Sequence, residues 1–196
     1  MGRSRFLVPF LIWALVATTP ALPADARQRR AHVTDLQVAR SGDRLQVSYR
    51  IEAGFSEELA EKIEAGIPVS FRHRAEVTTR HWLPLWPRGT VASATVETTV
   101  KYDSLTHRYE LSRVVEMSSR GKRKSPPQTR RESTVHESEA RAWMTEIHAF
   151  PPLDLSTLPV DGTARVRVES ALGRKWIVLV PTRRIVSKDY KLEPAP

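Results

Sequence analysis

The chain has 196 residues, a formal net charge of +9 and no cysteine. Its length is enough for one domain with a sizeable hydrophobic core. The absence of cysteine excludes disulfides, thiol catalysis, thiolate metal sites and lipid attachment to a cysteine side chain. An exported protein that needs no disulfide is more typical of a bacterial cell envelope than of a small secreted eukaryotic scaffold.

Residues 1–26 have the pattern of a secretory signal peptide. They open with Arg3 and Arg5, continue with an apolar run and end with a small-residue cleavage pattern at residues 24–26. The apolar run is short and contains Pro9, which favours a cleaved leader over a stable membrane span. We therefore expect an exported, periplasmic protein. The alternative is a protein anchored in the inner membrane by an uncleaved N-terminal helix.

The net positive charge limits the classes of partner. It favours an acidic envelope protein or an anionic lipid or lipopolysaccharide surface, and in an exported protein it disfavours nucleic acid. Basic residues that only solvate the surface would give the same composition, so charge alone does not identify a partner. Nor does the sequence indicate an oligomeric state.

The first predicted elements are a hairpin and a helix. Residues 31–39 and 45–51 alternate between apolar and polar side chains, with turn residues between the two runs, which predicts two half-buried strands. The helix begins at Ser56, whose hydroxyl can accept a hydrogen bond from the first turn. Gly66 follows at the position where a left-handed residue ends a helix.

Three antiparallel strands are predicted next. Residues 69–80 and 92–102 both alternate with period two, so each strand has one buried and one exposed face. Between them, residues 81–89 contain two prolines, which interrupt a strand. A turn at residues 103–106 leads to a third strand that starts at Tyr109.

A basic segment and a second helix follow. The segment 118–131 is rich in Lys and Arg, contains Pro126-Pro127 and has no acidic residue, which predicts a mobile loop. Thr134 and Glu137 have capping-box spacing. Residues 140–147 then place apolar side chains on one face of a helix.

The C-terminal part is predicted to add further strands. Residues 164–168 alternate, and Gly173 is interpreted as a turn. Residues 176–180 form a nearly continuous apolar strand, central in its sheet, that Pro181 ends. Residues 183–190 form a last edge strand.

These elements predict an α+β fold that is mostly antiparallel β and sandwich-like, with about seven strands and two short helices. We expect a single β-rich domain over residues 27–193, with the basic mobile loop at about residues 118–131. No internal repeat is evident.

The sequence contains no local catalytic, metal or cofactor motif. Its six histidines include no pair at a spacing typical of metal ligands, and it lacks the glycine patterns of nucleophile elbows, phosphate loops and dinucleotide sites. We therefore predict no catalytic residue, no metal and no cofactor. The alternative is an envelope hydrolase or transferase whose site is assembled from distant residues such as His73, Asp103 and Arg108.

Two segments are candidate binding surfaces. An aromatic-proline loop with two Trp and two Leu is unfavourable to leave in water, so it can enter a bilayer interface, cap a cavity, hold a partner or fold back over the core. The basic segment either docks on an anionic surface or is a solvated insertion. The predicted binding residues are Trp82, Leu83, Leu85 and Trp86 of the first segment and Arg120, Lys122, Arg123 and Lys124 of the second.

The turn between the second and third central strands is predicted to be structural. Asp103 can bond its own backbone, and an ion pair with Arg108 can lock the turn. The residues of this turn are Tyr102, Asp103, Leu105, Thr106, Arg108 and Tyr109.

Four short motifs occur together with the predicted leader. They are Val33-Thr34-Asp35-Leu36, Phe55-Ser56-Glu57-Glu58-Leu59, Gly66-Ile67-Pro68-Val69 and Lys101-Tyr102-Asp103-Ser104-Leu105-Thr106-His107-Arg108-Tyr109. This set resembles the bacterial domain of unknown function 4390 family. The resemblance covers most of residues 30–190 and is good over 33–109. It implies an envelope location and one β-rich domain, and it implies no activity.

The later part of the chain departs from that family in two places. The basic segment is an unusual insertion, and residues 189–192 stand where the family commonly closes with a Trp-rich strand. Together, the observations favour a non-enzymatic periplasmic or envelope domain that binds a protein partner or an amphipathic ligand.

Overall fold

The computed structural model describes most of the chain after the predicted signal peptide. The described residues are 30–79, 89–121, 124–148, 150–158, 164–177 and 180–192, without the side chains of 174–184. The predicted signal peptide and the Trp82–Trp86 loop lie outside the described residues.

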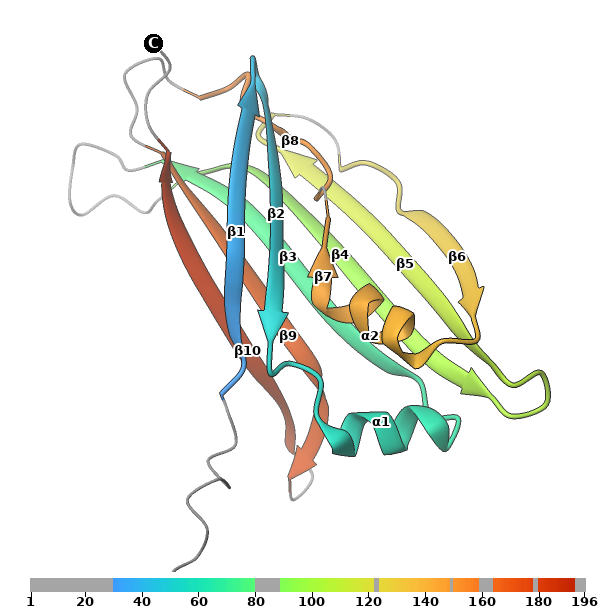
Figure 1. The fold of residues 1–196 in the computed structure, drawn as a ribbon. Coiled ribbons are helices and arrows are strands. Elements are labelled where there is room, and N and C mark those ends of the chain that lie inside the picture. Colours follow the sequence, from blue (N-terminus) through green and yellow to red (C-terminus); the bar gives the residue numbers. More distant parts are fainter. Residues whose placement is uncertain are drawn as a thin grey trace, which may run out of the picture.

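Two helices and ten strands occur in the described part of the chain (Figure 1). In chain order they are β1 (His32–Ser41), β2 (Arg44–Glu52), α1 (Glu57–Glu64), β3 (Val69–Thr79), β4 (Gly89–Asp103), β5 (Arg108–Ser119), β6 (Gln128–Thr134), α2 (Glu137–Thr145), β7 (Glu146–Ile147), β8 (Leu153–Asp154), β9 (Ala164–Ile177) and β10 (Val180–Leu192).

The strands form two antiparallel sheets. The large sheet has the order β10-β9-β3-β4-β5-β6, and the small sheet has the order β1-β2-β7, with β8 also paired to β2. Figure 1 shows β1 and β2 crossing in front of the large sheet, with α1 and α2 near one end. The mostly antiparallel, sandwich-like prediction with two short helices is therefore confirmed, although about seven strands were expected.

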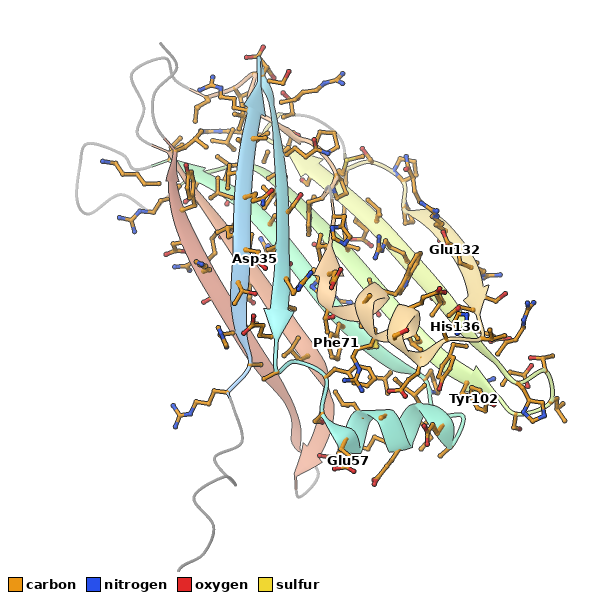
Figure 2. The ribbon with its side chains drawn as sticks, viewed as in Figure 1. Asp35, Glu57, Phe71, Tyr102, Glu132 and His136 are labelled. Carbon is orange, nitrogen blue, oxygen red and sulfur yellow. The ribbon has the colours of Figure 1, made fainter. Side chains whose placement is uncertain are left out.

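Alternating burial explains why the long strands form. In β3, Phe71 and Ala75 are fully buried while Arg72 and Arg74 between them are exposed. This is the arrangement that a period-two pattern predicts for a strand with one face in the core. Figure 2 places Phe71 between the sheets and Glu132 and His136 at the side of the large sheet, where β6 leads into α2.

The two helices close the open end of the sandwich. Leu59 and Ile63 of α1 and Ala140 and Met144 of α2 are buried, and all four join the core that fills the space between the sheets. Burial of a Leu, Ile or Met side chain stabilises the folded state by roughly 1.5–3 kcal/mol relative to exposure. The helices are two to three turns long, so this packing is what holds them.

Gly66 ends α1 as predicted. Its φ angle is +76°, in the left-handed region. The Gly66 amide donates to the Ile63 carbonyl and the Ile67 amide donates to the Lys62 carbonyl, each at 2.9 Å. This is the Schellman arrangement, which satisfies carbonyls that the helix end leaves free.

The start of α2 differs from the predicted capping box. The N-cap residue is His136, not Thr134. The Thr134 hydroxyl accepts from the His136 amide at 3.1 Å and donates to the Glu139 carboxylate, two residues beyond the Glu137 that was expected. The helix also ends earlier than predicted, because Ile147 belongs to β7.

The basic segment is shorter than the sequence indicates. Ser118 and Ser119 continue β5, and β6 begins at Gln128, so residues 128–131 are strand rather than loop. The edge of β5 offers unpaired backbone N–H and C=O groups, so β6 can form hydrogen bonds with it. The charged side chains of β6 then remain exposed to water. The charge of Arg130 is compensated by an ion pair with Glu132.

The C-terminal strands are longer than predicted. Gly173 does not turn the chain; it lies inside β9 with a φ of +56°, next to the register shift between Thr182 and Arg184. A glycine is suited to this position because an irregular ladder calls for unusual backbone angles. Pro181 does not end a strand, because it lies in β10, an edge strand where a missing donor is tolerated. Of the predicted strand 176–180, Trp176 and Ile177 end β9, and Val180 begins β10 and pairs with Ile177.

No helix in the described part of the chain is long and apolar enough to cross a membrane.

Candidate functional site

A groove on the inner side of the large sheet is the candidate functional site. Its floor is formed by β4, β5 and β6, and its wall is formed by the segment that follows β7. The groove has a volume of about 330 Å³, which lies at the lower end of the range for small-molecule sites. Its lining residues are Gln46, Val96, Arg113, Val115, Met117, Gln128, Ile147, His148, Phe150, Pro151 and Pro152.

The groove exists because the two sheets differ in width. At the edge of the small sheet, β7 and β8 have only two residues each. They cannot cover β5 and β6, which continue the large sheet beyond them. Val115 and Met117 of β5 are consequently only partly buried, although they pack against the core.

Arg113 is the charged group of this groove. Its guanidinium carbon lies 4.1 Å from the centre of the Trp143 ring, and its Nη2 donates to the Trp143 carbonyl at 3.1 Å. Trp143 Nε1 donates in turn to the Ser112 carbonyl at 3.3 Å. The indole and the guanidinium therefore hold each other on the surface of β5, in a stacked cation–π contact.

Arg113 keeps its positive charge although its surroundings lower its pKa. Burial lowers the pKa of Arg113 and Arg130 adds to this, whereas Glu132 opposes the shift. An arginine side chain nevertheless stays protonated in a protein. The groove therefore combines apolar walls with one half-buried cation.

One donor of that cation has no acceptor in the part of the chain that the structure describes. Arg113 Nε is buried, and among the described residues no group accepts its hydrogen bond. A buried charged donor without a partner is unfavourable by roughly 1–3 kcal/mol or more. The guanidinium is thus held in a position that its own protein neighbours satisfy only in part.

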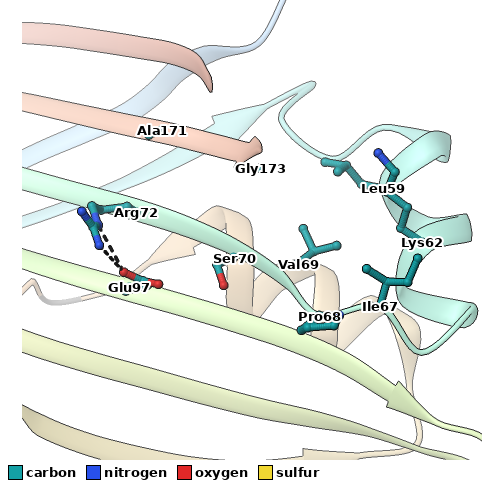
Figure 3. Close-up of a pocket in the computed structure, with 10 residues that line it drawn as sticks. All are labelled: Leu59, Lys62, Ile67, Pro68, Val69, Ser70, Arg72, Glu97, Ala171 and Gly173. Atoms are coloured by element: carbon teal, nitrogen blue, oxygen red, sulfur yellow. Dashed lines mark hydrogen bonds and ion pairs between the residues drawn. The ribbon is translucent and has the colours of Figure 1, made fainter. Parts of the chain in front are cut away.

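A larger hollow lies on the outer face of the large sheet beside α1 (Figure 3). Its volume is about 440 Å³. Figure 3 shows the ion pair between Arg72 and Glu97, in which Arg72 Nη2 lies 2.7 Å from Glu97 Oε2. Lys62 Nζ lies 2.9 Å from Glu58 Oε1. Because each of its cations has an acidic partner within the protein, this hollow has less to offer a charged ligand than the groove.

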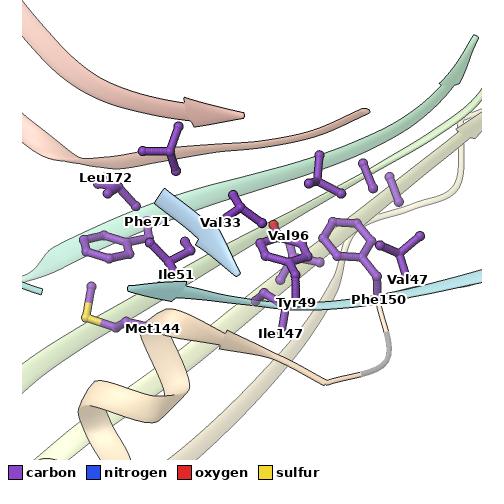
Figure 4. Packing of buried hydrophobic residues seen from close by; sticks show 14 of the residues in the cluster. Val33, Val47, Tyr49, Ile51, Phe71, Val96, Met144, Ile147, Phe150 and Leu172 are labelled. Carbon is purple, nitrogen blue, oxygen red and sulfur yellow. The ribbon is translucent and has the colours of Figure 1, made fainter. Parts of the chain in front are cut away.

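A polar cluster lies inside the core, between the sheets. His73 Nδ1 is 3.0 Å from the Ser170 hydroxyl, which is 3.1 Å from the Tyr49 hydroxyl, and His73 Nε2 is 3.4 Å from Thr98 Oγ1. His73, Thr98 and Ser170 are fully buried. Figure 4 shows Tyr49 among apolar residues of both sheets, with Phe150 beside it.

Burial keeps this cluster neutral. It lowers the pKa of His73 from 6.5 to about 3, with a further contribution from the positive charge of Arg113. Burial likewise raises the pKa of Tyr49. The side chains of the cluster satisfy one another, so it links the two sheets and presents no charged group to solvent.

Phe150 connects the cluster with the groove. Its ring stacks on Tyr49 with a centroid distance of 6.4 Å, and Phe150 also lines the groove. The groove therefore borders the buried core between the two sheets.

Of the three residues that were considered for an assembled catalytic site, the structure separates His73 from Asp103 and Arg108. His73 pairs across the sheet with Val96, seven residues before Asp103 on the same strand. At the rise of a β-strand this is roughly 20 Å. Asp103 and Arg108 face each other across the β4–β5 turn at the exposed end of the sheet.

Asp103 holds that turn through hydrogen bonds. One carboxylate oxygen accepts from the Leu105 amide and the other from the Thr106 hydroxyl, both at 2.9 Å. These bonds lower the pKa of Asp103. Tyr102 and Tyr109 pack across the base of the turn with ring centroids 4.9 Å apart. Asp103 thus closes the turn through these two hydrogen bonds, and the described residues show no ion pair between Asp103 and Arg108.

The predicted binding residues lie apart from the groove or outside the described residues. Trp82, Leu83, Leu85, Trp86, Lys122 and Arg123 fall outside them. Arg120 is exposed at the end of β5, and its amide donates to the Val91 carbonyl. Lys124 pairs with Glu116 at 2.7 Å, and this contact lowers the pKa of Glu116.

Sequence reasoning missed the groove, although one signal for it was present. Tyr109, Leu111, Val115 and Met117 alternate on the inner face of β5, and Arg113 occupies the middle of that apolar row. A lone arginine at an inward position of a strand indicates a partly buried cation that is a candidate for ligand binding. No comparable signal marks Pro151 and Pro152, because they reach the groove only through tertiary packing.

Comparison with known proteins identifies one family. Residues 28–195 match the family described as Domain of unknown function (DUF4390). No curated protein and no solved structure matches the chain. Within the described residues, no group of three or more His, Asp or Glu side chains is placed to hold a metal ion.

Proposed function

The chain belongs to the DUF4390 family, and we propose that it is an exported, non-enzymatic domain of the bacterial cell envelope that binds an amphipathic ligand. The groove beside β5 carries this proposal. It joins a row of partly buried apolar side chains to the half-buried guanidinium of Arg113, and these are the two chemical features that an amphipathic molecule requires.

Three features of the sequence support the cellular location. The first residues have the pattern of a signal peptide, the chain has no cysteine, and its net charge is +9. A basic, disulfide-free protein suits an envelope that contains anionic lipids.

The state of His73 supports binding rather than catalysis. A general base works best when its pKa lies near the operating pH and when it reaches the substrate. His73 is fully buried, and its pKa is lowered to about 3. Its ring therefore serves the core, and the groove beside it offers an apolar surface and one cation.

Native mass spectrometry of the protein purified from its own envelope tests the proposal. We expect a small-molecule adduct on the wild-type chain. The adduct should be lost in Val115→Trp, because the indole fills the groove. It should persist in Val114→Trp, the matched control, because Val114 lies on the opposite face of the same strand. Circular dichroism confirms that both variants fold.

Two results would contradict the proposal. A bare mass would show that no ligand is carried, and a mass accompanied only by another protein would show that the domain is an interaction module. An adduct that survives Val115→Trp would place the ligand elsewhere.

A further inference from the structure

We infer that the groove is specific for an aliphatic carboxylate of medium chain length, with its carboxylate on Arg113 and its hydrocarbon chain along Val115 and Met117. This inference rests on the proposed ligand-binding function and adds the chemical class of the ligand. It is carried by the charge, the hydrogen-bonding state and the shape of the groove.

The state of Arg113 calls for an anion. Its Nη2 donates to the Trp143 carbonyl, its buried Nε has no acceptor among the described residues, and its plane is held against the Trp143 ring. Stacking leaves the edges of a guanidinium as its hydrogen-bonding sites. A carboxylate can accept a charge-assisted bond from the part of the guanidinium that faces the groove, and bonds of this kind are about twice as strong as neutral ones.

The charges around the groove indicate an anion with a single charge. Arg130, the cross-strand neighbour of Arg113, is paired with Glu132. His148 lies 2.9 Å from the Glu146 carboxylate. Arg113 is therefore the one lining cation whose ion pairing is incomplete among the described residues. A phosphate monoester, with its second charge, would lack a second counter-ion.

The shape of the groove indicates a single chain of limited length. Arg113 and Met117 are four residues apart on β5, which corresponds to about 13 Å along the strand. Val115 lies between them on the same face, and Phe150 and Pro151 form the apolar wall. A volume of about 330 Å³ accommodates one such chain and not a whole phospholipid.

Isothermal titration calorimetry of the full chain with decanoate, decanol and decyl phosphate, each below its micelle concentration, tests the inference. We expect decanoate to bind roughly tenfold to a hundredfold more tightly than decanol, because only decanoate can form a charge-assisted bond with the half-buried guanidinium. Decyl phosphate should bind more weakly than decanoate. In Arg113→Gln, decanoate and decanol should bind equally.

Arg130→Gln is the matched control, since it removes the same charge from the adjacent strand at an exposed position. It should preserve the preference for decanoate. An independent measurement on the wild-type chain avoids any folding defect of the Arg113 variant: the guanidinium N–H resonances of Arg113 should shift with decanoate and stay in place with decanol.

The outcomes separate the inference from the function beneath it. Equal binding of decanoate and decanol to the wild-type chain, or guanidinium N–H resonances that do not move, overturns the carboxylate assignment while a ligand-binding role stands. Tighter binding of decyl phosphate overturns the assignment in favour of a phosphate. If none of the three amphiphiles binds and no adduct is found on the native protein, the proposed function itself fails.

Discussion

The hydroxyl of Tyr49 lies 3.1 Å from the hydroxyl of Ser170, although 121 residues separate them in the chain. Tyr49 belongs to β2 of the small sheet and Ser170 to β9 of the large sheet. Their hydrogen bond therefore crosses the sandwich, and His73 is bound to the same serine. Ser170 therefore contacts Tyr49 of the small sheet and His73 of the large sheet through hydrogen bonds.

Ser170→Ala is expected to destabilise the fold by roughly 1–3 kcal/mol, because it leaves both His73 and Tyr49 without their common partner in the core. Urea unfolding followed by circular dichroism measures this change. Ser93→Ala, on the outer face of β4, is the control and should change the free energy of unfolding by less than about 0.5 kcal/mol. Equal midpoints for the two variants would mean that the cluster contributes nothing to stability.

His73 should make the fold sensitive to acid. Its pKa is lowered from 6.5 to about 3, chiefly by burial, so between these values the unfolded chain binds a proton that the folded protein does not. The stabilisation from neutral His73 is thus complete above pH 6.5 and is lost as the pH falls toward 3. The total loss is at most about 5 kcal/mol.

His73→Gln isolates this effect, because the amide can still donate and accept hydrogen bonds and does not titrate in this range. The free energy of unfolding of the wild type, measured relative to His73→Gln, should decrease between pH 6.5 and pH 4. Other titrating groups are common to both proteins and cancel. A difference that stays constant with pH would show that His73 is protonated with an ordinary pKa.

Asp103→Ala should lower the thermal midpoint more than Asp103→Asn. The asparagine side chain retains one oxygen that can accept from the Leu105 amide, whereas alanine retains none. Because hydrogen bonding lowers the pKa of Asp103, its contribution in the wild type is present at neutral pH and declines as the carboxylate is protonated. Differential scanning calorimetry at pH 7 compares the three proteins, and identical midpoints would contradict a role for Asp103 in the turn.

Gly66→Ala should destabilise the protein by about 1–2 kcal/mol, the usual unfavourable energy of a Cβ atom in the left-handed region. Steric crowding adds little, since the nearest atom to the new Cβ is the Tyr102 carbonyl oxygen at 3.6 Å. Gly66→Asn should be milder because asparagine tolerates this conformation. Chemical denaturation distinguishes the variants, and an alanine variant as stable as the wild type would contradict the conformational argument.

The sequence by itself determined the features that depend on neighbours along the chain. The alternation around Phe71 indicated β3, because side chains on a strand point to opposite faces with a period of two. Gly66 indicated the end of α1 and Asp103 indicated the β4–β5 turn, because backbone conformation at these points depends on a few adjacent residues.

Only the tertiary structure decided which strands pair and what their contact leaves open. The pairing of β3 with β9 joins residues about a hundred positions apart, and the edge strand β6 recruits a segment whose composition is that of a loop. A local sequence pattern does not identify these pairing partners, because the energy of pairing depends on the complementary faces of segments that are distant in the chain. Arg113 meets Trp143 and the groove wall only after the sheets have packed with unequal widths, so the candidate site belongs to the fold and not to any one motif.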